Sequence, residues 1–196
     1  MRCRAVLAVT LALPLATAAS ATEPPAAGRY AGEERRAIKS LSVEDVDELR
    51  RGGGWGLAKA AELNGMPGPT HLLELREAIP LEAAQVAALE ALLVAMQDDA
   101  ISVVEELIDL EAALDAQFRN GTITEASLGE LLAQIAETRA RLRYIHLATH
   151  LATPALLSEQ QIVRYNELRG YASDACAGEP PAGHDPAMWR RHRGCD

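Results

Sequence analysis

The sequence contains few aromatic residues, and this scarcity excludes several kinds of fold. Only 4% of its 196 residues are aromatic, with one Phe and two Trp. Because β-strands are rich in aromatic and β-branched side chains, a β-sandwich or β-barrel is not expected. Alanine, leucine and glutamate, which tolerate or favour helices, recur throughout the chain. We therefore expect an all-α protein.

The sequence motifs of several enzyme classes are also missing. There is no G-x-S-x-G, no G-x-x-x-x-G-K-[ST], and no G-x-G-x-x-G between a strand and a helix. The hydrolytic zinc motif H-E-x-x-H is absent, because Leu147 follows His146 where the catalytic glutamate would stand. The net charge of -9 disfavours binding to nucleic acid. We predict a protein that is not an enzyme and does not bind nucleic acid.

The first 21 residues have the three parts of a secretory signal peptide. Arg2 and Arg4 precede an apolar stretch at 5–16, and a small-x-small cleavage site ends at Ala21. The apolar stretch is shorter than the ~20 residues that a membrane span needs, and no later stretch approaches that length without charges. We expect export, cleavage near Ala21 and no membrane span.

Two cysteines, Cys176 and Cys195, remain after residue 21. In an oxidising compartment outside the cytoplasm, an even pair of this kind is typical of a disulfide. Two free thiols are an alternative. Zinc bound by both cysteines with His184 and His192 is another, although the spacing matches no common zinc finger.

Glycine and proline divide the rest of the chain. We expect a flexible leader at 22–32, short broken helices at 33–79, a helical domain at 80–171 and a Gly/Pro-rich tail at 172–196. Within 33–79, helix breakers cluster at 52–56 and 64–69. The loop at 52–56 is interpreted as a hinge between helices.

Apolar residues repeat at a spacing of seven along two segments of the helical domain. The first stripe comprises Val86, Leu93, Ala100, Leu107 and Leu114 with Leu89, Met96, Val103 and Leu110 between them, and the second comprises Leu128, Ile135, Leu142 and Thr149 with Leu131, Thr138 and Ile145. Asn120-Gly121 separates the segments, since glycine favours the left-handed conformation after a helix. We expect a long, elongated antiparallel helical hairpin with short flanking N- and C-terminal helices.

Two segments, each expected to open a helix, share a short motif. Leu157, Ser158 and Gln161 fit L-[TS]-x-x-Q, and Leu81 with Gln85 forms a degenerate copy. The serine hydroxyl is suited to cap a helix. In an exported all-helical chain of this size, the motif resembles the Spy/CpxP-like family of periplasmic proteins, which includes heavy-metal-binding and metal-resistance proteins. The resemblance covers roughly residues 68–171 and implies a periplasmic binding protein that responds to envelope stress or to metals.

Histidines provide candidate metal ligands. His146 and His150 form H-x-x-x-H, which places both imidazoles on one face of a helix. Folding the chain back at Asn120-Gly121 brings Met96 and Glu90 near them, and His71 can add a third imidazole. Such a set suits Cu, Ni, Co or Zn. The alternative is that the histidines only flank the helical seam, hydrogen-bonded to Glu90 or to water.

The apolar residues Leu147 and Leu151 point away from the predicted seam. They leave a second apolar side, which a terminal helix or a second subunit can cover, and we expect a homodimer. By resemblance to the family, these leucines are also candidates for contact with unfolded clients. An ATP-independent chaperone for unfolded or basic clients is thus an alternative to metal binding, and a structural partner of a membrane regulator is a third possibility.

Overall fold

The computed structural model describes residues 28–171 and 185–188. The predicted signal peptide and the two cysteines, Cys176 and Cys195, lie outside these residues. The chain divides into two units, residues 1–34 and 35–196. In the described part of the first unit, the backbone turns and the Gly32 N–H donates to Glu34 Oε2 at 2.6 Å.

The described part of the second unit is helical, as expected from the composition. Its elements are α1 (Val43–Arg50), α2 (Lys59–Glu62), α3 (Pro69–Glu74), α4 (Ala83–Asn120), α5 (Glu125–Ala152), the short η2 (Thr153–Leu156) and α6 (Glu159–Arg169). A further short 3-10 helix, η1 (Glu33–Arg35), lies where the two units meet in the chain. No helix among the described residues is both long enough and apolar enough to cross a bilayer.

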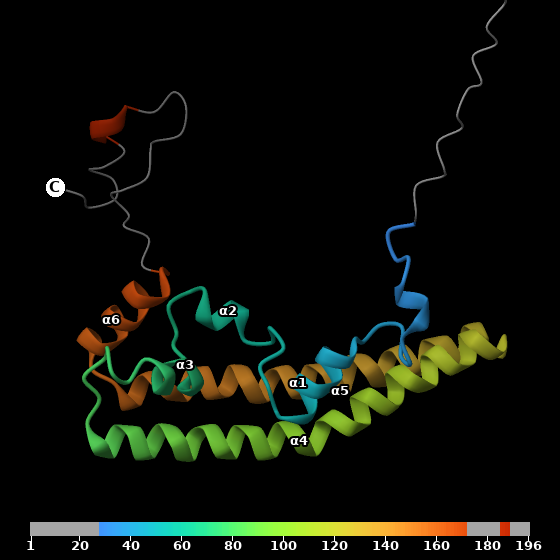
Figure 1. Cartoon of the computed structure of the whole chain (residues 1–196), viewed down its shortest axis with the longest axis horizontal. Helices are drawn as coiled ribbons and strands as arrows, with labels where there is room; N and C mark the ends of the chain where they lie inside the picture. The colour runs from blue at the N-terminus through green and yellow to red at the C-terminus, as the bar shows by residue number, and fades with distance from the viewer. Residues whose placement is uncertain (1–27, 172–184, 189–196) are drawn as a thin grey trace, which may run out of the picture. The chain divides into compact units, whose positions relative to one another are not determined.

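Helices α4 and α5 pack against each other, joined by a short turn (Figure 1). Gly121 ends α4 in the left-handed conformation, with φ of 64°, and the Thr124 hydroxyl caps α5 by accepting from the Ser127 N–H. The predicted stripes share one core cluster, in which Ala100, Val103 and Leu107 of α4 lie with Ile135 and Leu142 of α5. Their buried members are Leu89, Met96, Ala100, Val103 and Leu107 on α4, and Leu131, Ile135, Thr138, Leu142 and Thr149 on α5.

The shorter helices α1, α2 and α3 lie along the α4–α5 pair (Figure 1). α1 and α3 contact α4, and α2 contacts α5. The core has two parts. One is centred on Val104, Leu107 and Leu142 with Leu49 of α1, and the other gathers Leu72, Ile79, Leu89 and Tyr165 around the beginning of α4 and around α6.

The glutamines of the two L-x-x-x-Q segments bind each other in a near-symmetric arrangement. Gln85 and Gln161 each donate from Nε2 to the other's Oε1 at 2.9 Å. Each Nε2 also donates to the carbonyl before the other motif, Leu156 O or Pro80 O, at 2.8 Å. Each Oε1 also accepts from the backbone N–H of the N-cap residue of its own helix. The motif therefore joins the beginnings of α4 and α6. These contacts use the full hydrogen-bonding capacity of both glutamine side chains.

Candidate functional site

A cavity of about 510 Å³ lies between α2, α3 and the 52–56 loop on one side and α4 and α5 on the other. Four of the five predicted metal ligands line it: His71, Met96, His146 and His150. Glu90 does not line the cavity and is exposed on α4. The structure thus brings together residues that are as far apart in the chain as 71 and 150.

His150 is buried, and its orientation is fixed by the segment before α3. Its Nδ1 lies 2.9 Å from Met66 O. Because a carbonyl oxygen only accepts, Nδ1 carries the hydrogen and the neutral ring keeps a lone pair on Nε2. A Cβ placed on Gly68 would lie 2.5 Å from Nε2, so only glycine permits this close approach. Metal-binding histidines usually have this pattern, in which the other nitrogen donates to a backbone carbonyl.

His146 lies one helical turn before His150 and is 2% exposed. Its Nε2 is buried and has no hydrogen-bond partner among the described residues. Burial lowers the pKa of His146, the nearby His150 lowers it further, and Glu48 opposes the shift. A buried imidazole held neutral has the protonation state that a metal requires of a ligand.

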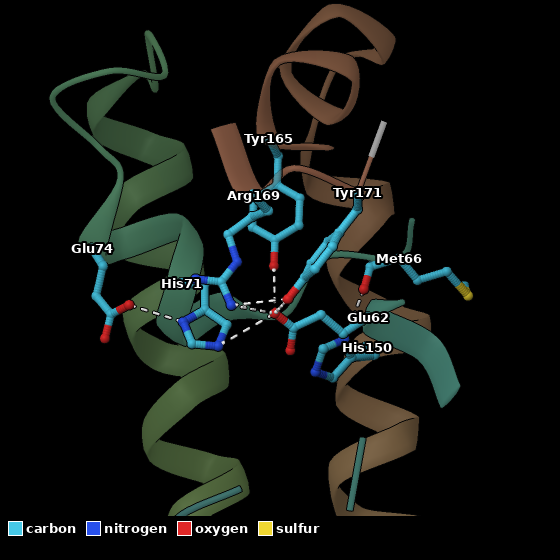
Figure 2. Close-up of polar contacts among 8 residues, drawn as sticks. All are labelled: Glu62, Met66, His71, Glu74, His150, Tyr165, Arg169 and Tyr171. Carbon is cyan, nitrogen blue, oxygen red and sulfur yellow. Dashed lines mark hydrogen bonds and ion pairs between the residues drawn. The ribbon is translucent and has the colours of Figure 1, made fainter. Parts of the chain in front are cut away.

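His71 is bound differently from the other two histidines (Figure 2). Its Nδ1 lies 2.9 Å from Glu74 Oε2, and its Nε2 lies 3.4 Å from Glu62 Oε1. Both ring nitrogens therefore face carboxylate oxygens. His71 lines the cavity, but it would have to leave at least one of these partners to bind a metal.

Glu62 of α2 is the centre of a polar cluster that holds α6 (Figure 2). Its Oε1 accepts from Arg169 Nη2 at 2.8 Å, from the Tyr171 hydroxyl at 3.0 Å and from the Tyr165 hydroxyl at 3.3 Å. Burial acts to raise the pKa of Glu62, but the hydrogen bond from Tyr171, the charge of His71 and the contacts with Arg169 outweigh it and lower the pKa. Burial, with the charge of Glu62, raises the pKa of Tyr165.

The 52–56 loop forms another wall of the cavity and is held firmly. Trp55 has a φ of 39°, which is rare for a residue other than glycine. Its indole Nε1 donates to Asp45 Oδ1 at 2.8 Å, and its backbone N–H donates to Glu48 Oε1 at 2.7 Å. The guanidinium of Arg139 lies 4.5 Å from the centre of the Trp55 ring. The segment predicted to be a hinge is therefore tied to both α1 and α5.

Few side chains on the cavity wall can act as metal ligands. Among residues 28–171 and 185–188, no group of three or more His, Cys, Asp or Glu is placed to hold a metal ion. His146, His150 and the thioether of Met96 remain as the soft and borderline donors of the lining. The two predicted client-contact residues on α5 differ, since Leu147 is half-buried and Leu151 is 66% exposed.

The cluster around Glu62 has no signal in the sequence. Arg169, Tyr165 and Tyr171 show no motif with Glu62, which lies more than 100 residues away in the chain. In the sequence, Gly68 is recognisable only as a helix breaker. No pattern within one segment reveals these contacts, since each joins the N-terminal segment to α5, to α6 or to Tyr171 just after α6.

Comparisons with family models, with curated proteins and with solved structures gave no match to this chain.

Proposed function

We propose that this protein is a non-enzymatic periplasmic binding protein of the Spy/CpxP-like type, dimeric, whose cavity binds a divalent transition-metal ion. The observation that carries the proposal is the unpartnered Nε2 of His146, buried in a cavity wall that His150 and Met96 share. An unsatisfied buried polar atom costs stability, and a metal ion would supply the missing interaction. The signal peptide and the helical stripes support the exported, elongated hairpin that the family resemblance implies.

The donor chemistry narrows the choice of ion. Imidazole nitrogen suits Cu, Ni, Co and Zn, and a thioether favours copper among them. His150 and His146 would hold the ion, and Met96 would add a weaker contact. His71 belongs to the cavity but is already bound by Glu62 and Glu74.

Calorimetric titration with Cu, Ni, Co and Zn tests this function. We expect one ion per chain for at least one of these metals, and a loss of at least tenfold in affinity when His150→Gln removes one imidazole. Met96→Leu should weaken copper binding more than nickel binding. Met188→Leu, which makes the same change at an exposed methionine outside the cavity, is the matched control. Absence of binding by the unmodified protein, or equal binding by the His150 variant, would refute the proposal.

A chaperone is the second candidate, and the exposed apolar surface of α5 favours it. Leu151 is 66% exposed and Tyr144 is 72% exposed, and both are large side chains. If this surface holds clients, the protein should suppress aggregation of a reduced model client, and Leu151→Glu with Tyr144→Glu should abolish the suppression. Unchanged suppression by that double variant would exclude this surface.

A further inference from the structure

The cavity that contains the proposed metal ligands also contains the point where the end of α6 is attached. Glu62, Arg169 and Tyr171 line it together with His146 and His150. Arg169 is the last residue of α6, and Tyr171 follows it by two residues. The end of α6 and the proposed ion would therefore border one cavity of about 510 Å³.

The attachment is concentrated on one oxygen of Glu62 (Figure 2). Its Oε1 accepts from Arg169 Nη2 at 2.8 Å and from the hydroxyls of Tyr171 and Tyr165 at 3.0 and 3.3 Å. His71 Nε2 lies 3.4 Å from the same oxygen. The last turn of α6 therefore depends on the negative charge of a single carboxylate.

A divalent cation in this cavity would act on both members of the Glu62–Arg169 ion pair, with opposite signs. It would attract the carboxylate and repel the guanidinium. The two side chains are only 15% and 29% exposed, so water screens these charges less than it screens a surface ion pair. The cation and Arg169 would thus compete for one carboxylate.

The beginning of α6 is held independently of the cavity. Gln161 exchanges hydrogen bonds with Gln85 and donates to Pro80 O, and none of these three residues lines the cavity. A weaker contact with Glu62 would therefore free the last turn of α6 and leave its first turn in place.

We propose that Glu62 is shared between the cavity ion and α6, so that metal binding loosens the last turn of this helix. The inference rests on the proposed metal binding and identifies a structural response to it. Such coupling is reciprocal, because an ion that weakens the contact of Glu62 with Arg169 must itself be bound less tightly when that contact is made. The end of α6 therefore limits the affinity of the cavity for the ion.

Calorimetric titration of the full-length mature protein with Cu, Ni, Co and Zn tests the reciprocal effect. Arg169→Gln removes the competing charge and should raise the affinity at least about fivefold, and Glu62→Gln should lower it by a similar factor. Tyr171→Phe removes one hydrogen bond to Glu62 without changing any charge and should raise the affinity about twofold. Arg164→Gln is the matched control, because it removes a charge from an exposed ion pair of α6 with Glu167, outside the cavity, and should leave the affinity unchanged.

Amide hydrogen exchange, measured by mass spectrometry with fragmentation to single residues, gives a second readout. Saturation with the ion that binds most tightly should speed exchange at 167–169 at least about fivefold and leave exchange at 162–164 unchanged. If neither Arg169→Gln nor Tyr171→Phe binds the ion more tightly, or if exchange at 167–169 does not become faster, the sharing of Glu62 is wrong while metal binding stands. If no metal binds to the unmodified protein or to any variant, both proposals are wrong.

Discussion

Replacing His146 by leucine should make the metal-free protein more stable by about 1–2 kcal/mol and abolish its metal binding. The unpartnered Nε2 is buried without a hydrogen bond, and an apolar side chain of similar size removes this cost. Chemical denaturation with and without added metal measures both effects. In the unmodified protein, the metal should raise the denaturation midpoint, and in His146→Leu it should leave the midpoint unchanged.

His150→Leu is the matched control, because the two histidines lie on the same face of α5. This change removes the donor to Met66 O and should destabilise the metal-free protein by about 1 kcal/mol. Both variants should fail to respond to metal, while their stabilities move in opposite directions. A His146→Leu protein that is less stable than the unmodified one would show that His146 has a structural partner.

The pH dependence gives an independent readout of His146. Its pKa in the folded protein lies below the ordinary value of 6.5, so the unfolded chain binds more protons near pH 6 than the folded one does. Stability should therefore fall as the pH is lowered from 7.5 through 6.5. His146→Leu should flatten this part of the stability profile.

The helices and the apolar stripes were predictable because they depend on spacing within one segment. Local signals also indicate where helices end and begin. A glycine follows Asn120 at the end of α4, and the hydroxyls of Thr124 and Ser158 cap the beginnings of α5 and α6. The alignment of α4 with α5 was predicted less accurately. Ser127 and Thr138 of α5 donate to Gln117 and Glu106 of α4, so the helices are shifted by about one helical turn from a simple fold-back at Asn120-Gly121. This shift explains why Glu90 does not reach His150.

The cavity could be predicted only in part. The four-residue spacing of His146 and His150 predicts that both lie on the same face of α5. The spacing of apolar residues in α4 predicts that Met96 lies between the two helices. The opposite wall depends on long-range contacts that no single segment encodes. Gly68 lies against His150, and Gly52, with φ of 65°, lies against the Gln97 backbone, where an added Cβ would be 3.0 Å away. Such close approaches are set by the tertiary packing of the N-terminal segment.

Glu62→Gln should loosen α6 and lower the free energy of unfolding by about 2–3 kcal/mol. The carboxylate accepts from Arg169 and from two tyrosine hydroxyls, and its side chain is 15% exposed, so it interacts with little screening from solvent. The amide keeps the shape but loses the charge that balances Arg169. Chemical denaturation measures the loss, and amide hydrogen exchange should become faster in α6 than in the central turns of α4.

Glu167→Gln is the control for this change, because Glu167 pairs with Arg164 at an exposed site of α6 and should contribute less than 1 kcal/mol. The sign of the pH effect adds a second check. The pKa of Glu62 is below its ordinary value of 4.5 in the folded protein, so its contribution is complete above that pH and is lost as the pH falls below it. The difference between the unmodified protein and Glu62→Gln should therefore shrink below about pH 4.5. A difference that stays constant down to pH 3 would mean that the carboxylate charge does not hold α6, and that the variant acts through packing alone.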